Sequence, residues 1–287
     1  MGTLRSPRPW VWLTLLGLAA LVLTGIFAYL VPVAHSRDAA ALQAFSELDR
    51  PRTATAWSRL RSLCDPGSYA LLGGVLLLVA LLRRRPRTAG AVAFLLVATG
   101  LTTQTLKPLL AAPRYDEWLG YAPIGAGSWP SGHSTAAMTL ALCLVLVAPR
   151  RLRPTAGVLG AAFALVIGVS NVVLAVHWPS DVVGGYLVAG TWTVAVLGVL
   201  AWAERGHPSA EGRADAREQA LGPLPRRDVV VPVIAALGEL ALVAGIVAAR
   251  AGQATDFAMS HPTALLVGSV IAGLAMLLPL ALSRGTT

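Results

Sequence analysis

Apolar residues of this chain gather in long runs, and short polar segments separate the runs. Runs of this length with few internal charges are typical of membrane-spanning helices. The shortest, at 67–82, follows Asp65-Pro66, a cap residue and a proline suited to the first turn of a helix; a re-entrant or interfacial segment is the alternative there. We predict spans at about 10–33, 67–82, 88–106, 132–148, 156–176, 181–203, 229–250 and 262–283.

Composition agrees with this pattern. Hydrophobic residues make up 55% of the 287 residues and charged residues only 13%, and the mean hydropathy is +0.66. These values predict an all-α fold, a polytopic membrane helix bundle. The first run follows Arg5 and Arg8 as a secretion signal does, but its length of about 24 residues favours a retained span.

The arginines indicate which loops lie in the cytoplasm. With the N-terminus inside, 15 of the 23 Lys and Arg residues fall in cytoplasmic segments and eight in outward ones. Positive residues favour the cytoplasmic side, so both termini are predicted inside. The basic balance, with a pI near 10.7, therefore comes from loop anchors and not from a nucleic-acid surface. Cys64 and Cys143 are predicted to be free thiols, because their positions make pairing improbable.

The first outward segment, 34–66, carries apolar residues at three-residue steps among polar ones, including Leu42, Phe45 and Leu48, then Trp57 and Leu60. This spacing predicts two short amphipathic helices on the membrane surface. Such helices could cover a site as a lid or act only as an interfacial anchor.

Candidate chemistry lies in two outward loops. His133 stands in Pro130-Ser131-Gly132-His133, and His177 precedes Asp181 by four residues. Lys107, the only lysine of the chain, and Arg114 lie in the same loop as His133. With every span counted, both loops face the same side of the membrane.

These residue types suit a phosphate monoester. Lys107 and Arg114 supply cations, and Ser131 can cap the fourth span so that the backbone amides of Gly132 and His133 point outward. A helix N-terminus of this kind is an anion site, and glycine allows close approach.

Two imidazoles could complete a reaction. A neutral imidazole can attack phosphorus to give a covalent phospho-enzyme, and a carboxylate that holds its other nitrogen orients it and stabilises the developing charge. His177 and Asp181 have suitable spacing. His133 could then protonate the leaving alkoxide and later deprotonate water. The outward loops contain no cluster of carboxylates for a metal, so a metal-independent reaction with no cofactor is predicted.

The ordered motifs Lys-x6-Arg, Pro-Ser-Gly-His and Ser-x6-His-x3-Asp resemble those of the type 2 phosphatidic acid phosphatases. These are integral membrane lipid phosphatases, related to soluble vanadium haloperoxidases and bacterial acid phosphatases. The resemblance covers residues 107–181 and implies a six-span core to about residue 203. It implies that His177 is the nucleophile, His133 the general acid and Asp181 the orienting carboxylate. The implied phosphate-binding residues are Lys107, Arg114, Ser131, Gly132 and Ser170.

Two positions depart from the family pattern. Asn171 stands where the family usually has arginine, and Tyr115 where it usually has proline. Loss of a guanidinium removes charge-assisted hydrogen bonds, each worth roughly 1.5–3 kcal/mol. An arginine of the first outward segment could replace it, the substrate could differ, or the chain could be an inactive relative.

The resemblance implies a phosphatase-like core at 1–203. The mixed charges, glycines and prolines of 204–228 predict a flexible cytoplasmic linker, and the apolar runs within 229–287 predict two extra C-terminal membrane helices. Glu239 falls near the centre of the seventh span, where an unpaired carboxylate is costly and a buried role is expected. The two extra helices are candidates for a homodimer contact.

The expected function is hydrolysis of a lipid phosphate or diphosphate, of polyprenyl or glycerolipid type, at the extracytoplasmic face of the cell membrane. The expected partners are the lipid substrate and the bilayer. One alternative is a lipid phosphotransferase that uses an alcohol acceptor, and another is a non-catalytic lipid-binding relative.

Overall fold

The computed structural model describes residues 7–49, 51–112, 114, 124–207, 209–220 and 251–285. Within these ranges the regular structure is entirely helical, which confirms the all-α prediction. The helices are α1 (Pro7–Leu30), α2 (Pro32–Ser46), α3 (Pro51–Arg61), η2 (Ser62–Cys64), α4 (Pro66–Leu82), α5 (Pro86–Leu109), α6 (Gly132–Val147), η4 (Arg150–Leu152), α7 (Arg153–Val173), α8 (Pro179–Gly206), α9 (Ala210–Ala220), α11 (Ala251–Ser260) and α12 (Pro262–Gly285).

Proline sets the start of many of these helices. α2, α4, α5 and α8 all carry it at a first-turn position. The ring fixes φ at a helical value, and the missing N–H is one that a helix start leaves without an intrahelical partner. The predicted starts of α4, α5 and α8 lie within about two residues of the observed ones.

Five described helices, α1, α5, α7 with η4, α8 and α12, are long and apolar enough to cross a membrane. The helical segment ending at Cys64 and α4 pass the same test together but are bent by 54°, which would bring the number to six. The chain is thus a multi-pass membrane protein. The spans predicted at 67–82 and 132–148 are apolar helices of 17 and 16 residues. The predicted span 229–250, with Glu239, lies outside the described residues.

α6 forms the centre of the bundle. It contacts α4, α5, α7, α8 and α12, and α1 packs on the outer side of α8. Thirteen of its 16 residues are buried, so its surface faces protein and not lipid. Close packing here depends on small residues: a Cβ on Gly160 of α7 would lie 3.0 Å from the Ala141 side chain of α6.

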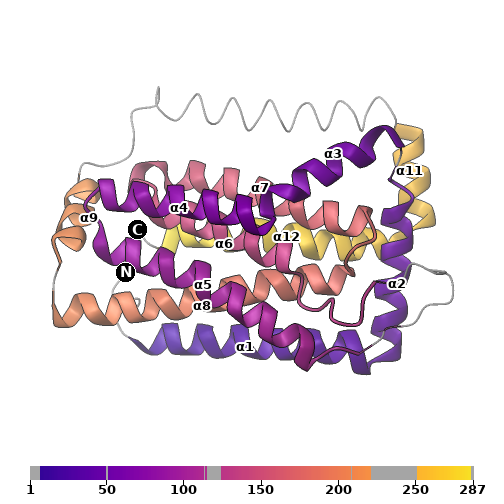
Figure 1. Ribbon diagram of the computed structural model, residues 1–287, viewed down its shortest axis with the longest axis horizontal. Helices are drawn as coiled ribbons and strands as arrows, with labels where there is room; N and C mark the ends of the chain where they lie inside the picture. Colours follow the sequence, from indigo (N-terminus) through magenta and orange to yellow (C-terminus); the bar gives the residue numbers. More distant parts are fainter. Residues whose placement is uncertain are drawn as a thin grey trace.

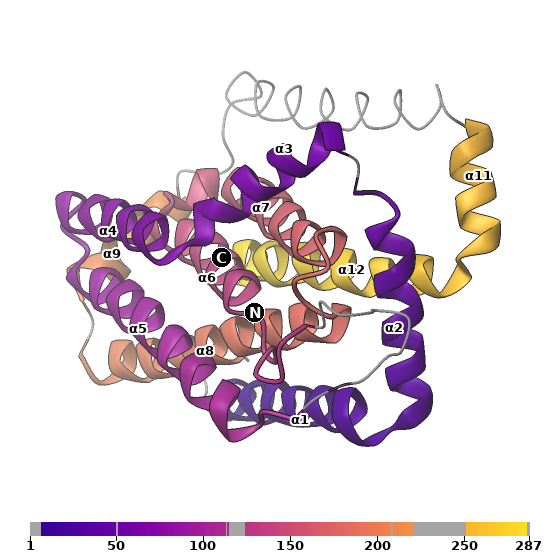
Figure 2. The same cartoon turned by 45° about the vertical axis from the view of Figure 1, so that its right-hand side comes forward.

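The long helices run side by side, whereas α2 and α11 cross one end of the bundle and α9 lies at the other (Figure 1; turned by 45° in Figure 2). α1 begins and α12 ends at the α9 end (Figure 1). α3 leads from the α2 end towards α4 (Figure 2). The 34–66 segment therefore contains two short helices, as predicted. α2 has five buried residues, whereas α3 is mostly exposed.

The last helix belongs to the main core. Ile271 and Ala275 of α12 are buried within it, with 1% and 0% of their surface exposed. A Cβ on Gly190 of α8 would lie 3.1 Å from Leu278, and one on Gly157 of α7 would lie 3.2 Å from the Pro279 carbonyl oxygen. The described C-terminal helix thus completes the bundle around α7 and α8.

Part of the segment predicted as a flexible linker is ordered as α9. Glu211 accepts hydrogen bonds from the backbone N–H groups of Arg87 (2.6 Å) and Thr88 (3.3 Å) at the start of α5. Arg87 also pairs with Glu204 of α8. A carboxylate at a helix N-terminus is favourable, which explains why the acidic residues of this segment hold it against the bundle.

Candidate active site

The predicted site residues gather where α6 and α8 begin and where α5 and α7 end. The Ser131 N–H, just before α6, donates to the Asp181 carbonyl oxygen of α8 at 2.9 Å. The two helix starts approach closely because residue 185 is glycine: a Cβ there would lie 2.7 Å from the Ser131 carbonyl oxygen and 2.9 Å from the Thr135 backbone nitrogen. We call this contact the α6–α8 junction.

This junction gives a direct test by substitution. Gly185→Ala is expected to force α6 and α8 apart, because backbone atoms cannot move away as a flexible side chain can. We expect a loss of roughly 1–3 kcal/mol in stability together with loss of catalytic activity, measured as a fall in melting temperature and in phosphate release in detergent. Gly100→Ala in α5 is the matched control, since its Cβ would meet nothing within 4 Å; it should be neutral or slightly stabilising. Equal behaviour of the two variants would contradict the prediction.

The His177–Asp181 contact is present as the four-residue spacing predicts. His177 Nδ1 lies 3.2 Å from Asp181 Oδ2, and the Trp178 N–H donates to the same oxygen at 3.1 Å. Asp181 is fully buried. A carboxylate that accepts from Nδ1–H leaves Nε2 with its lone pair available. The local geometry therefore suits an imidazole nucleophile.

The turn between α7 and α8 places His177. Ala175 has a positive φ of 50°, and the backbone N–H groups of Val176 and His177 donate to the Asn171 carbonyl oxygen at 3.1 and 3.3 Å. These bonds end α7 and reverse the chain before Pro179 starts α8. His177 is thus fixed at a helix start, with 8% of its surface exposed.

Arg114 occupies the centre of a buried charge cluster. Its guanidinium pairs with Asp181 and donates to Ser180 Oγ at 2.9 Å and Ser128 Oγ at 2.8 Å. Asp38 Oδ2 of α2 lies 3.4 Å from it. The side chain predicted to bind phosphate therefore contacts protein oxygens in this structure and also holds the carboxylate that orients His177.

Two aromatic rings flank the same guanidinium. Its carbon lies 4.9 Å from the ring centre of Tyr29 and 5.0 Å from that of Trp178. Cation–π contacts of this kind stabilise a desolvated arginine. They explain how Arg114 is buried to 5% exposure.

Asp38 is a site-proximal residue that the sequence analysis missed. Its carboxylate accepts hydrogen bonds from the Ser180 backbone N–H at 2.9 Å and from the Ser180 hydroxyl. Asp38 therefore binds the first turn of α8. Burial raises the pKa of Asp38 to about 6, and the Ser180 hydrogen bond opposes that rise. A signal was available: Asp38 lies on the same helical face as Leu42 and Phe45, so an acidic residue falls on the apolar face of that helix.

The raised pKa of Asp38 predicts a pH-dependent stability. An unfolded aspartate has a pKa of about 3.9, so the folded chain holds the proton more tightly. This contribution is full below about pH 4 and is lost as the pH rises through 6, at a cost of about 3 kcal/mol. Asp38→Asn should flatten the melting temperature between pH 4 and 6.5 in detergent. The exposed Asp256 provides the control, Asp256→Asn. A slope unchanged by Asp38→Asn would contradict the assignment.

Lys107 and the start of α6 form an anion cradle. Lys107 Nζ lies 3.7 Å from the position that a Cβ on Gly132 would take. Ser131 caps α6, its side chain accepting from the Ser134 N–H at 3.3 Å. The amides of Gly132 and His133 follow the cap and have no carbonyl partner within the helix. Cation and amides therefore converge on one spot at a helix N-terminus, as an anion site requires.

His133 contacts two charged residues that precede α4 and that the motifs do not include. Its Nε2 lies 2.9 Å from Asp65 Oδ1. Arg61 Nη1 lies 3.2 Å from Nδ1 and 3.1 Å from Nε2. Asp65 is the N-cap residue of α4, as predicted, but its carboxylate makes no capping bond and reaches the imidazole instead.

Ser170 and Asn171 lie in the last turns of α7 and are fully buried. The Ser170 hydroxyl donates to the Ile167 carbonyl oxygen at 2.7 Å, within its own helix. Asn171 Nδ2 donates to Ser134 Oγ of α6 at 3.1 Å. The residue in place of the family arginine thus ties α7 to α6. Tyr115 lies outside the described residues.

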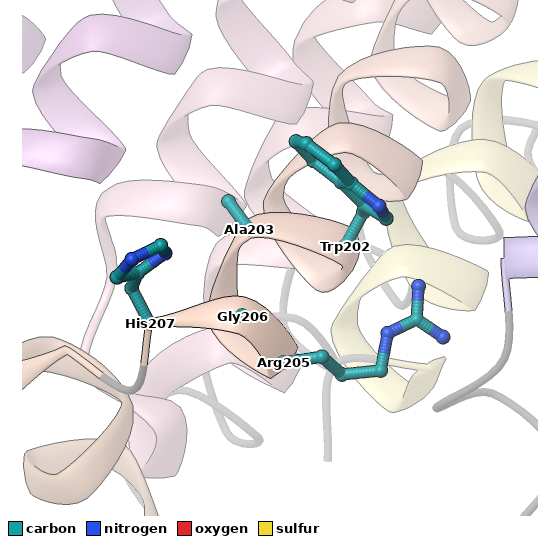
Figure 3. A pocket seen from close by; sticks show the side chains of 5 residues that line it. All are labelled: Trp202, Ala203, Arg205, Gly206 and His207. Carbon is teal, nitrogen blue, oxygen red and sulfur yellow. The ribbon is translucent and has the colours of Figure 1, made fainter.

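A surface pocket occurs elsewhere, at the far end of α8. Trp202, Ala203, Arg205, Gly206 and His207 line it (Figure 3). His207 follows Asp181 by 26 positions, which at 1.5 Å a residue places the two about 39 Å apart. This pocket is therefore separate from the site. Among the described residues, no group of three or more His, Cys, Asp and Glu could hold a metal ion.

Comparisons with known proteins find two similar proteins. An undecaprenyl-diphosphatase from Sulfolobus acidocaldarius is 38% identical over 65 residues, 23% of this chain, and the chain spans only 29% of that relative's length. The crystal structure of a transmembrane PAP2-type phosphatidylglycerolphosphate phosphatase from Bacillus subtilis matches with a TM-score of 0.48 and 17% identity, over 69% of this chain and 98% of that one.

The family model that matches is that of the PAP2 superfamily, over residues 88–205. This range begins in α5 and ends in α8, and it contains Lys107, Arg114, His133, His177 and Asp181. The site residues predicted from the sequence therefore lie within the matched segment. Residues 88–205 are therefore similar to the PAP2 superfamily.

Proposed function

We propose that this chain is a membrane lipid phosphatase that hydrolyses a lipid phosphate or diphosphate. The observation that carries the proposal is the His177–Asp181 pair, 3.2 Å apart, beside the Lys107 amine and the start of α6. The relative from Sulfolobus acidocaldarius, an undecaprenyl-diphosphatase, makes polyprenyl diphosphates a leading substrate class.

The reaction proceeds in two steps. His177 Nε2 attacks phosphorus while the bond to the leaving oxygen breaks, and His133 gives that oxygen a proton. Asp181 stabilises the positive charge that develops on the His177 ring. Water then attacks the phospho-histidine, gives its proton to His133 and releases phosphate, which restores both imidazoles. Lys107 and the amides of Gly132 and His133 neutralise charge on the phosphoryl oxygens.

We place the site at the extracytoplasmic face. The arginine-rich loops at 83–87 and 150–153 join helices at the opposite end from the His177 turn. Positive loops favour the cytoplasm, so this distribution supports an outward site and cytoplasmic termini. An outward site would meet lipid headgroups of the outer leaflet.

Phosphate release from a panel of lipid phosphates and diphosphates in detergent tests the proposal. The assay is run without added metal and with a chelator. Release in both conditions would support a metal-independent reaction, and release that chelation abolishes would refute that part. If the chain releases phosphate from no member of the panel, the proposed function is refuted.

A further inference from the structure

Two charged side chains at His133 come from outside the segment that the family model matches. Arg61 ends α3 and Asp65 precedes α4, whereas the match begins at residue 88. The helical axis bends by 54° between Cys64 and Pro66. Both side chains reach the imidazole from this bend, on the side of the bundle formed by α3 and α4.

The Arg61 guanidinium lies over the His133 ring. One nitrogen, Nη1, is within 3.2 Å of both ring nitrogens. In the plane of the ring, a position this close to both Nδ1 and Nε2 would overlap ring carbons such as Cε1. The Arg61 nitrogen therefore lies above the plane of the ring. The planar guanidinium carries five N–H donors in a fork that matches phosphate oxygens. Only Nη1 contacts the face of the His133 ring, so most of the N–H donors of Arg61 remain available to a ligand beside His133.

The charge that Arg61 brings is one that α7 does not supply. Asn171 is neutral, fully buried, and donates to Ser134 Oγ at 3.1 Å. The cations near the phosphoryl position are Lys107 and Arg114, and the latter pairs with Asp181 and Asp38. Arg61 therefore adds its cation beside the proton donor and not beside the nucleophile's carboxylate.

That position is the leaving-group side of the reaction. In the proposed mechanism His133 gives its proton to the departing oxygen, so whatever is attached to that oxygen lies next to Arg61. When the substrate is a lipid monophosphate, the leaving group is the neutral lipid alcohol, which has no charge for a guanidinium to bind. When the substrate is a lipid diphosphate, the leaving group is a lipid monophosphate. Its phosphate oxygens can accept bidentate, charge-assisted hydrogen bonds from arginine.

We propose that Arg61 binds the second phosphate of a lipid diphosphate, the one nearer the lipid, and gives the site a preference for diphosphates. This inference rests on the proposed function. His177 Nε2 attacks the terminal phosphorus, the bond from that phosphorus to the bridging oxygen breaks, and the bridging oxygen takes a proton from His133. Arg61 holds the departing lipid monophosphate, and water later releases inorganic phosphate from His177.

The test compares two substrates that differ by one phosphate. Farnesyl diphosphate and farnesyl monophosphate are given to the purified full-length chain in detergent, and kcat/KM is measured for each. Arg61→Ala is expected to lower kcat/KM for the diphosphate about tenfold to a hundredfold, the range for lost charge-assisted hydrogen bonds. For the monophosphate the expected fall is at most about threefold, on the same basis.

Two further variants sharpen the result. Arg59→Ala removes an exposed arginine from the same helical turn and should leave both rates unchanged. Arg61→Lys keeps the charge without the fork and should retain part of the preference. The retained monophosphate rate of Arg61→Ala shows in the same assay that the variant is folded.

The outcomes separate the two proposals. Equal losses for both substrates, or no loss for either, would overturn the role of Arg61 while leaving the phosphatase function intact. A wild-type chain that releases phosphate from neither farnesyl substrate would overturn the diphosphate preference, and one that releases it from no lipid of the wider panel would overturn the phosphatase function as well. A selective loss for the diphosphate is the result that we expect.

Discussion

His177→Ala is expected to abolish phosphate release from every lipid substrate, with a fall of at least about three orders of magnitude in kcat. Among the described residues, the imidazole is the only group paired with Asp181 that could attack phosphorus, at 3.2 Å from its Oδ2. Alanine offers no nucleophile in its place. Asp181 remains paired with Arg114 in the variant, so the loss should not arise from unfolding. Phosphate release and melting temperature are measured on the same sample.

His207→Ala is the matched control. His207 is an exposed imidazole at the opposite end of α8, so its removal should leave the rate unchanged. A His177→Ala variant that still turned over lipid phosphate would contradict the nucleophile assignment. One that lost turnover but kept the biological role of the chain would support the non-catalytic alternative.

Arg114→Met is expected to lower stability as well as activity. The substitution leaves Asp181 buried without its cationic partner, with Asp38 beside it, and breaking one partner of a buried ion pair typically costs about 3–5 kcal/mol. For a chain of this size the loss corresponds to roughly 10 °C or more in melting temperature. Thermal unfolding in detergent measures it. Adding Asp38→Asn should recover part of the loss, since one of the two carboxylates then becomes neutral.

Lys107→Met provides the contrast. No carboxylate among the described residues forms an ion pair with the Lys107 amine, although the amine lies close to Gly132. The variant should therefore lose activity with little change in melting temperature. Equal thermal stability of Arg114→Met and the wild type would show that the buried pair is not formed in the membrane protein.

The spans could be predicted because their signal is local. Apolar runs have the length of the bilayer, and proline marks the starts of helices such as α4, α5 and α8. The contact of His177 with Asp181 was equally predictable, since a histidine just before α8 is only four residues from a carboxylate in the first turn of that helix. The helix α9 was missed because its stabilising contacts, from Glu211 to Arg87 and Thr88, join residues more than a hundred positions apart.

The charge partners of the site were missed for the same reason, although Asp38 left a signal on the apolar face of its helix. Asp38 meets Ser180 across 142 positions, and Asp65 meets His133 across 68. Each depends on how α2 and the bend before α4 pack against the bundle, which no local spacing records. The motifs predicted the candidate catalytic groups, whereas Asp38, Arg61 and Asp65, which contact these groups or their neighbours, come from the segment 34–66.

Arg114 has a consequence for how the chain can vary over generations. The same guanidinium holds the carboxylate behind His177 and neutralises a cluster that would otherwise be costly to fold. Natural selection for turnover and selection for foldability therefore act on one side chain and cannot be satisfied separately. Substitution of Arg114 should therefore be tolerated in evolution only after Asp38 of α2 has been replaced.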